Sequence, residues 1–143
     1  MTATATLANT STRPASSASS NRQLRRSGAV AGVIAAAATV GVAGAADAMG
    51  VPIEIGGESI PLLGFAQLTL VATVIGVVMA SVMARRAVHA HRSFVVTTLA
   101  LTGLSFVPEV LADAQTATKL TLILTHVVAA AIVIPALASR LAD

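Results

Sequence analysis

Arg85-Arg86-Ala87-Val88-His89-Ala90-His91-Arg92 is the stretch that decides the fold, because it is a short basic turn between two long apolar runs. The runs are residues 62–84 and 93–111, and each is close to the ~20 residues that a helix needs to cross a bilayer. Arginines are costly inside hydrocarbon, so the turn is expected at a membrane surface. The sequence therefore predicts a membrane protein whose chain reverses direction at this turn.

The composition supports lipid rather than water as the main solvent. Only 10% of the 143 residues are charged, against about 25% in soluble domains, and the mean hydropathy is +0.85. The absence of cysteine excludes disulfides, thiolate metal sites and thiol nucleophiles. A net charge of +3 without a dense basic, aromatic-rich face argues against a nucleic-acid partner. No phosphate loop, nucleophile elbow or metalloprotease motif occurs, so neither an enzyme nor a cofactor is predicted.

The order of apolar and polar segments predicts an all-α fold, a membrane four-helix bundle with a disordered N-terminal tail. Residues 1–27 are rich in Thr, Ser and Ala, lack apolar periodicity and are expected to form a disordered cytoplasmic tail. Residues 28–143 are expected to form the four-helix domain, and its spans are about 28–49, 62–84, 93–111 and 118–138. Residues 50–59 are expected to form a loop with a short strand or lid.

The first span allows two interpretations. As a membrane helix, it carries small residues at four-residue spacing that would permit close helix approach. These are Gly28, Gly32, Ala36, Gly44 and Ala48. As a secretory signal, it would follow the basic pair before residue 27 and be cleaved near residue 48. We favour the retained helix.

Charge predicts the orientation. If the loops alternate between the two sides, the N-terminal tail, the basic turn and the C-terminus share one side and hold eight of the nine Lys and Arg residues, and Lys119 lies on the other. Because Lys and Arg mark the cytoplasmic side, both termini are expected in the cytoplasm, with the protein in the cell membrane. The residues expected at lipid headgroups are Arg25, Arg26, Arg85, Arg86, Arg92 and Arg140.

The stretch Thr116-Ala-Thr-Lys-Leu-Thr-Leu-Ile-Leu-Thr-His-Val-Val-Ala-Ala-Ala-Ile-Val-Ile-Pro135 resembles the last helix of an uncharacterised family of small four-helix membrane proteins of actinobacteria. A Thr-rich loop leads there into an apolar helix with one histidine and a late proline. The resemblance covers roughly residues 28–141. It implies that the first helix is retained, and it implies no activity.

One polar cluster could form inside the membrane. His126 is the ionisable residue deepest in a span, on the order of 12 Å below the outer edge at ~1.5 Å per residue. Glu109, Gln67 and Asp47 lie on the outer portions of the other spans and could share a pocket with it. A Glu109–His126 contact could exchange a proton. Alternatively, His126 is neutral and only bonds a neighbouring hydroxyl or carbonyl.

Other polar residues favour structural roles. His89 and His91 lack the further ligands that a metal site needs, so no metal is predicted there. The many Thr and Ser side chains of the third and fourth spans are expected to bond to helix carbonyls.

Three functional hypotheses follow. The first is a small helix-packing or interaction protein, whose partners are the lipid bilayer and either further copies of itself or another membrane protein. The second is a proton-coupled transport or channel component that uses Glu109 and His126. The third is a secreted-type precursor from which residues 1 to about 48 are cleaved.

Overall fold

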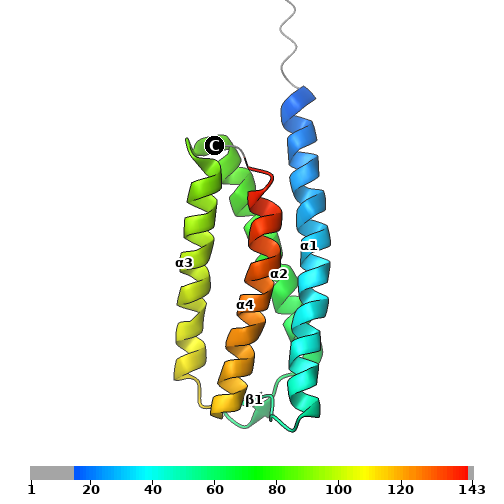
Figure 1. Cartoon of the computed structure of the whole chain (residues 1–143), viewed down its shortest axis with the longest axis vertical. Helices are drawn as coiled ribbons and strands as arrows, with labels where there is room; N and C mark the ends of the chain where they lie inside the picture. The colour runs from blue at the N-terminus through cyan, green and yellow to red at the C-terminus, as the bar shows by residue number, and fades with distance from the viewer. Residues whose placement is uncertain (1–14, 142–143) are drawn as a thin grey trace, which may run out of the picture.

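The computed structural model describes residues 15–141, and it confirms the all-α four-helix fold. The helices are α1 (Ala15–Ala48), α2 (Leu62–Arg86), α3 (Ala90–Leu111) and α4 (Thr116–Ala138). They run alternately up and down along one axis, so the start of α1 and the C-terminal end lie at the same end of the bundle (Figure 1). Each helix is long and apolar enough to cross a membrane, as expected for a multi-pass membrane protein.

A small hairpin closes the other end of the bundle. β1 (Glu54–Ile55) and β2 (Glu58–Ser59) pair antiparallel, with Glu54 opposite Ser59. Gly56 and Gly57 make the turn at positive φ, which glycine adopts without strain. The amide of Gly56 donates to the carbonyl of Asp113, so the hairpin is tied to the loop between α3 and α4. This hairpin is the short strand that the sequence suggested.

The predicted tail is wrong for residues 15–27, because α1 begins at Ala15 rather than Gly28. Leu24 is 2% exposed and packs with Phe94, Leu137 and Leu141, which are distant in the sequence. This contact draws the chain into the bundle before the apolar run begins. Residues 1–14, the rest of the predicted tail, lie outside the described residues. The other three spans agree with the predicted ranges to within one turn.

Helix α1 packs closely on α2 and α4 through its small residues. A Cβ at Gly32 would lie 2.9 Å from Cγ2 of Thr73 in α2. Ala31, Ala35 and Ala36 are buried on the same helix. Thr39 Oγ1 lies 3.1 Å from Thr69 Oγ1 of α2, which adds a hydrogen bond between the two helices. The small-residue face of α1 is therefore used inside the bundle.

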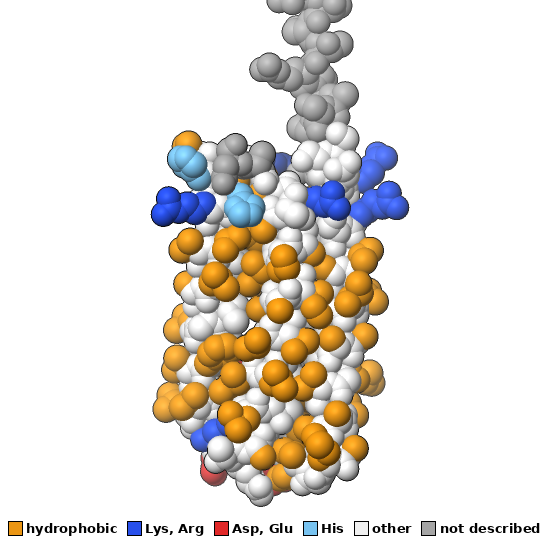
Figure 2. Space-filling view, in the orientation of Figure 1, with side chains coloured by type: hydrophobic (Ala, Val, Ile, Leu, Met, Phe, Trp, Pro, Cys, Tyr) orange, Lys and Arg blue, Asp and Glu red, His pale blue; other side chains and the backbone are white. Residues whose placement is uncertain are grey.

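The side chains are sorted by polarity along the long axis. Lys and Arg side chains gather at the end where α1 begins, apolar side chains cover the middle, and acidic side chains lie at the hairpin end (Figure 2). Leu63, Leu68, Leu104 and Val74 are among the large apolar residues that are more than 60% exposed. An apolar middle between two polar ends is what a bilayer requires.

The close contact at Gly32 predicts a stability difference between two glycines of α1. Gly32→Leu should lower the unfolding midpoint, because overpacking against Thr73 costs about 1–3 kcal/mol. Gly41→Leu is the matched control, since a Cβ there meets nothing within 4 Å. The measurement is loss of helical circular dichroism on heating in detergent. Equal midpoints for the two variants would contradict this packing.

Candidate intramembrane polar site

Glu109 and His126 form a close side-chain pair between two neighbouring helices. Glu109 lies in the last turn of α3, and His126 lies near the middle of α4. The Nδ1 atom of His126 is 2.6 Å from Oε1 of Glu109 and 3.0 Å from the carbonyl oxygen of Leu122. The structure therefore brings together the two residues on which the proton-exchange hypothesis depends.

The geometry assigns the histidine proton. Both neighbours of Nδ1 are acceptors, a carboxylate and a carbonyl, so Nδ1 carries a hydrogen and donates it. Within residues 19–141, the Nε2 atom of His126 has no hydrogen-bond partner. Nε2 can accept a hydrogen bond when the ring is neutral and donate one when it is protonated.

The two partners differ sharply in exposure. The side chain of Glu109 is 9% exposed, whereas that of His126 is 45% exposed. The second carboxylate oxygen of Glu109, Oε2, is buried without a hydrogen-bond partner. An unpaired buried charge is strongly unfavourable, so the imidazole is what makes a carboxylate tolerable here.

Gln67 and Asp47 stay apart from this pair. Both side chains are exposed, on α2 and α1 respectively. No hydrogen bond or ion pair among residues 19–141 joins either one to Glu109 or His126. Of the four residues that the sequence placed in one cluster, only Glu109 and His126 are therefore joined among the described residues.

His126 also lines a groove between α2, α3 and α4. The groove has a volume of about 290 Å³ and mostly apolar walls, which include Gly76, Leu101, Ala129 and Ile134. Helix α3 packs loosely beside it, because no residue of α3 between Thr98 and Glu109 is buried. The sequence does not predict this groove, since the groove depends on how the helices pack against one another.

The hydroxyl groups along the groove already have partners. Thr73 donates to the carbonyl of Thr69, Thr98 to that of Phe94, and Thr102 to that of Thr98. Ser105 donates to the carbonyl of Thr102. The predicted bonding of these side chains to helix carbonyls is confirmed. In the described walls, Nε2 of His126 therefore has no partner, whereas these hydroxyls have used their hydrogens and can only accept a hydrogen bond from a guest.

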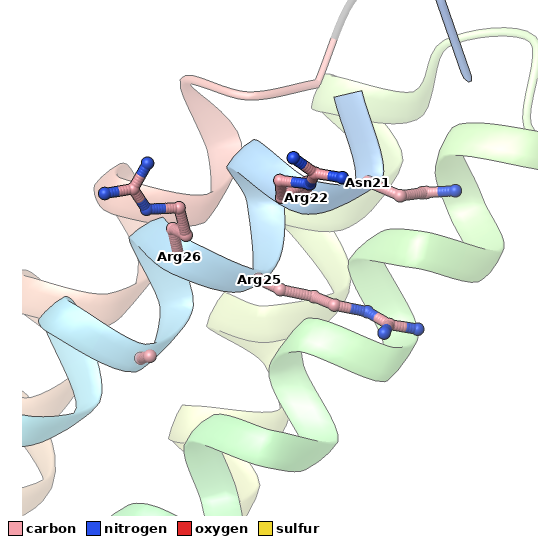
Figure 3. Close-up of a pocket in the computed structure, with 5 residues that line it drawn as sticks. Asn21, Arg22, Arg25 and Arg26 are labelled. Atoms are coloured by element: carbon pink, nitrogen blue, oxygen red, sulfur yellow. The ribbon is translucent and has the colours of Figure 1, made fainter. Parts of the chain in front are cut away.

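The predicted headgroup residues all lie at the basic end of the bundle, where Figure 2 shows the Lys and Arg side chains. Arg25 and Arg26 project to different sides of α1 (Figure 3). Arg85 and Arg86 end α2, and Arg92 lies in the first turn of α3. Arg140 follows α4, and its Nε donates to Oγ of Ser27 at 2.9 Å.

The structure places the two loop histidines beside these arginines. His89 precedes α3 and His91 lies in its first turn, and both are exposed. Among residues 19–141, no group of three or more His, Asp or Glu side chains is placed to hold a metal ion.

Comparison with known proteins identifies the family. The model of DUF6069, a family of unknown function, matches residues 19–143, and the chain belongs to this family. No curated protein and no solved structure matches the chain. The expected membership of an uncharacterised family is thus confirmed. The family match begins at residue 19, whereas the resemblance was expected to begin near Gly28. The actinobacterial source stays a prediction.

The pairing of Glu109 and His126 predicts energetic coupling between them. Each single change, Glu109→Leu or His126→Leu, leaves one polar group buried or unpaired, whereas the double variant removes both. We expect a coupling free energy on the order of 0.5–3 kcal/mol in a double-mutant cycle, measured by unfolding in mixed micelles.

Gln67→Leu combined with His126→Leu is the matched control for this cycle. Gln67 makes no contact with the pair, so its effect should add to that of His126 within experimental error. If Glu109 and His126 were also additive, the pair would not exist in the folded protein.

Proposed function

We propose that this DUF6069 protein binds a lipophilic molecule inside the bilayer and acts as a binding protein rather than an enzyme. The observation that supports this is the groove between α2, α3 and α4, with the Nε2 atom of His126 available at its wall. A well-formed apolar pocket with a few convergent polar groups is the usual form of a small-molecule site.

The size of the groove favours a slender guest. Its volume of about 290 Å³ lies near the lower end of known ligand pockets, about 300–1,000 Å³. An alkyl or isoprenoid chain can lie against the small residues Gly76, Ala129 and Ala130.

The chemistry of the wall favours a guest with one hydrogen-bonding group. The hydroxyls of Thr98, Thr102 and Ser105 donate to carbonyls of their own helix and can only accept from a guest. Nε2 of His126 has no partner among residues 19–141 and can anchor a polar atom of the guest. Glu109 contacts Nδ1 on the other side of the ring and so fixes the orientation of the imidazole. A hydroxyl or carbonyl at one end of an apolar chain fits this arrangement.

Proton-coupled transport is the second candidate, and the 2.6 Å pair favours it specifically. A carboxyl and an imidazole at this distance can pass a proton between them. Nε2 of His126 would carry the proton onward to the groove. Four short helices leave little room for a pathway within one molecule, so this function would require assembly of several copies.

Association with other membrane proteins, or with further copies, also stays a prediction. The small residues Gly28, Gly32 and Gly76, which motivated it, face neighbouring helices within the bundle. The surface left for a partner helix is that of α3, which is the least buried of the four spans. Gly103 of α3 is exposed, and a Cβ there would meet open space.

The orientation that we propose places the basic end in the cytoplasm and the protein in the cell membrane. Lys and Arg concentrate at that end, which is the usual cytoplasmic signal. We also propose that α1 is retained, because Leu24, Ala35 and Ala43 of α1 contribute to the core. Cleavage near residue 48 would uncover the faces of α2 and α4 that α1 covers.

The proposed groove can be tested with a photoreactive lipid. A long-chain alcohol that carries a diazirine, added to the purified protein in lipid nanodiscs, should label the segments that contain Met79, Leu101 and Ile134. Ala129→Phe fills the groove and should reduce this labelling about tenfold, which corresponds to 1.4 kcal/mol of binding free energy.

Ala100→Phe is the matched control, because Ala100 is exposed on α3 and lies outside the groove. It should leave the labelling unchanged. Labelling spread evenly over all four helices, or an equal effect of both variants, would show that the alcohol only dissolves in the surrounding lipid.

The orientation can be tested in intact cells because the chain has no cysteine. Glu58→Cys places a thiol in the exposed hairpin, and Val88→Cys places one in the basic turn, where Val88 is 87% exposed. A membrane-impermeant maleimide should modify the Glu58→Cys variant and spare the Val88→Cys variant until the cells are opened. The reverse pattern would overturn the proposed topology.

A further inference from the structure

A second groove lies between α1 and α4 at the basic end of the bundle. Its volume is about 410 Å³. Arg26 and Ser27 of α1, with Ser139 and Arg140 beyond the end of α4, line its polar part. Ile34 of α1 and Ile132 of α4 line its apolar part. The groove is separate from the one that His126 lines, and the binding function proposed above does not use it.

The spacing of the lining residues gives the groove two distinct ends. Arg26, Val30 and Ile34 follow one another at four-residue intervals, so they lie on one stripe of α1. On α4 and the turn after it, Ile132, Ala136 and Arg140 have the same spacing. Because the two helices run in opposite directions, both arginines lie at the membrane surface and both isoleucines lie about 12 Å deeper, at ~1.5 Å per residue.

Within residues 19–141, no acidic side chain lies close enough to neutralise the positive charge in this groove. Among residues 19–141, neither Arg26 nor Arg140 forms an ion pair. Asp47, Glu54, Glu58, Glu109 and Asp113 all lie near or at the hairpin end, away from these arginines. Arg140 donates through Nε to Ser27, which positions its guanidinium across the groove and leaves its two terminal nitrogens to donate to another acceptor.

The apolar part of the groove is exposed and could accommodate an alkyl chain. Val30 is 61% exposed and Ile34 is 53% exposed, although both face the space beside α4. Arg22 and Arg25 make a useful contrast, because they line a hollow with Arg26, Asn21 and Ala29 on α1 alone (Figure 3). That hollow has no apolar wall from a second helix.

We propose that this groove is a binding site for one anionic phospholipid. Arg26 and Arg140 hold the phosphate, since guanidinium groups form strong charge-assisted hydrogen bonds to phosphate oxygens. One acyl chain lies along Val30, Ile34 and Ile132. Basic pockets between helices at the membrane surface are suited to such headgroups. Such a site would hold one lipid in a fixed place, whereas the other arginines at this end attract anionic lipids without binding a particular one.

Native mass spectrometry of the purified full chain tests the proposal. The protein is mixed in mild detergent with phosphatidylglycerol and phosphatidylcholine that carry the same acyl chains. We expect one phosphatidylglycerol to be retained in preference to phosphatidylcholine. The double variant Arg26→Gln/Arg140→Gln should lower its retention on the order of tenfold or more, because each arginine near the surface contributes to headgroup binding.

The double variant Arg85→Gln/Arg86→Gln is the matched control, because it removes the same charge from the end of α2, outside the groove. This control variant should change the retention of phosphatidylglycerol by less than about twofold. Equal losses in the two double variants would reduce the effect to diffuse attraction and overturn the site. The circular dichroism of both variants is compared with the parent so that only folded proteins are scored.

A further variant and a competitor test the acyl-chain part. Ala136→Phe fills the lower groove without changing charge and should also reduce retention. Glycerophosphoglycerol, the headgroup without chains, should not displace the lipid at millimolar concentration. If the headgroup alone displaced it, or if Ala136→Phe had no effect, the site would bind free phosphate groups and the lipid assignment would be wrong.

Discussion

The need to satisfy every polar group without water is the constraint on which this structure depends. Inside hydrocarbon an unpaired backbone or side-chain group costs several kcal/mol, so the chain crosses as helices that close their own hydrogen bonds. The hydroxyls obey the same rule: Thr98 and Thr102 donate to carbonyls of their own helix. Glu109 and His126 satisfy it in part by pairing with each other, while Oε2 of Glu109 stays buried without a hydrogen-bond partner. The arginines satisfy it by lying at the basic end of the bundle.

Close packing of α1 brings three of the four helices together, and this in turn produces both grooves. Gly32 and the buried alanines let α1 approach α2 and α4, so the small faces are covered. Helix α3 has no comparable small face against its neighbours and packs mainly through Phe94, Thr98 and Glu109. The space left beside α3 becomes the groove that His126 lines. The groove at the membrane surface lies between two stripes of residues, one on each helix. The stripe of α1 contains Arg26, Val30 and Ile34, and that of α4 and the turn after it contains Ile132, Ala136 and Arg140.

The depth of a residue in the membrane can be predicted from the sequence far better than the side of the helix on which that residue lies. Counting along the spans places Glu109, Gln67 and Asp47 on the outer portions of their helices, within reach of the deeper His126, and this is sufficient to suggest the pair. Whether a residue at that depth meets His126 depends on which side of its helix faces α4. Spans that are apolar all around carry no signal for this, so Gln67 could not be separated from Glu109 in advance. The early start of α1 was missed for a related reason, because Leu24 is ordered by contacts with Phe94 and Leu137 far along the chain.

The four helices are expected to have lipid as their solvent, and fractionation of cell membranes tests this expectation most directly. After the membranes of cells that express the untagged chain are washed in alkaline carbonate, the protein should stay in the pellet and enter solution only with detergent. Large apolar side chains such as Val30, Leu68 and Leu104, which are exposed between the two polar ends of the bundle, require this result. Recovery of a monodisperse protein from the aqueous fraction without detergent would contradict it.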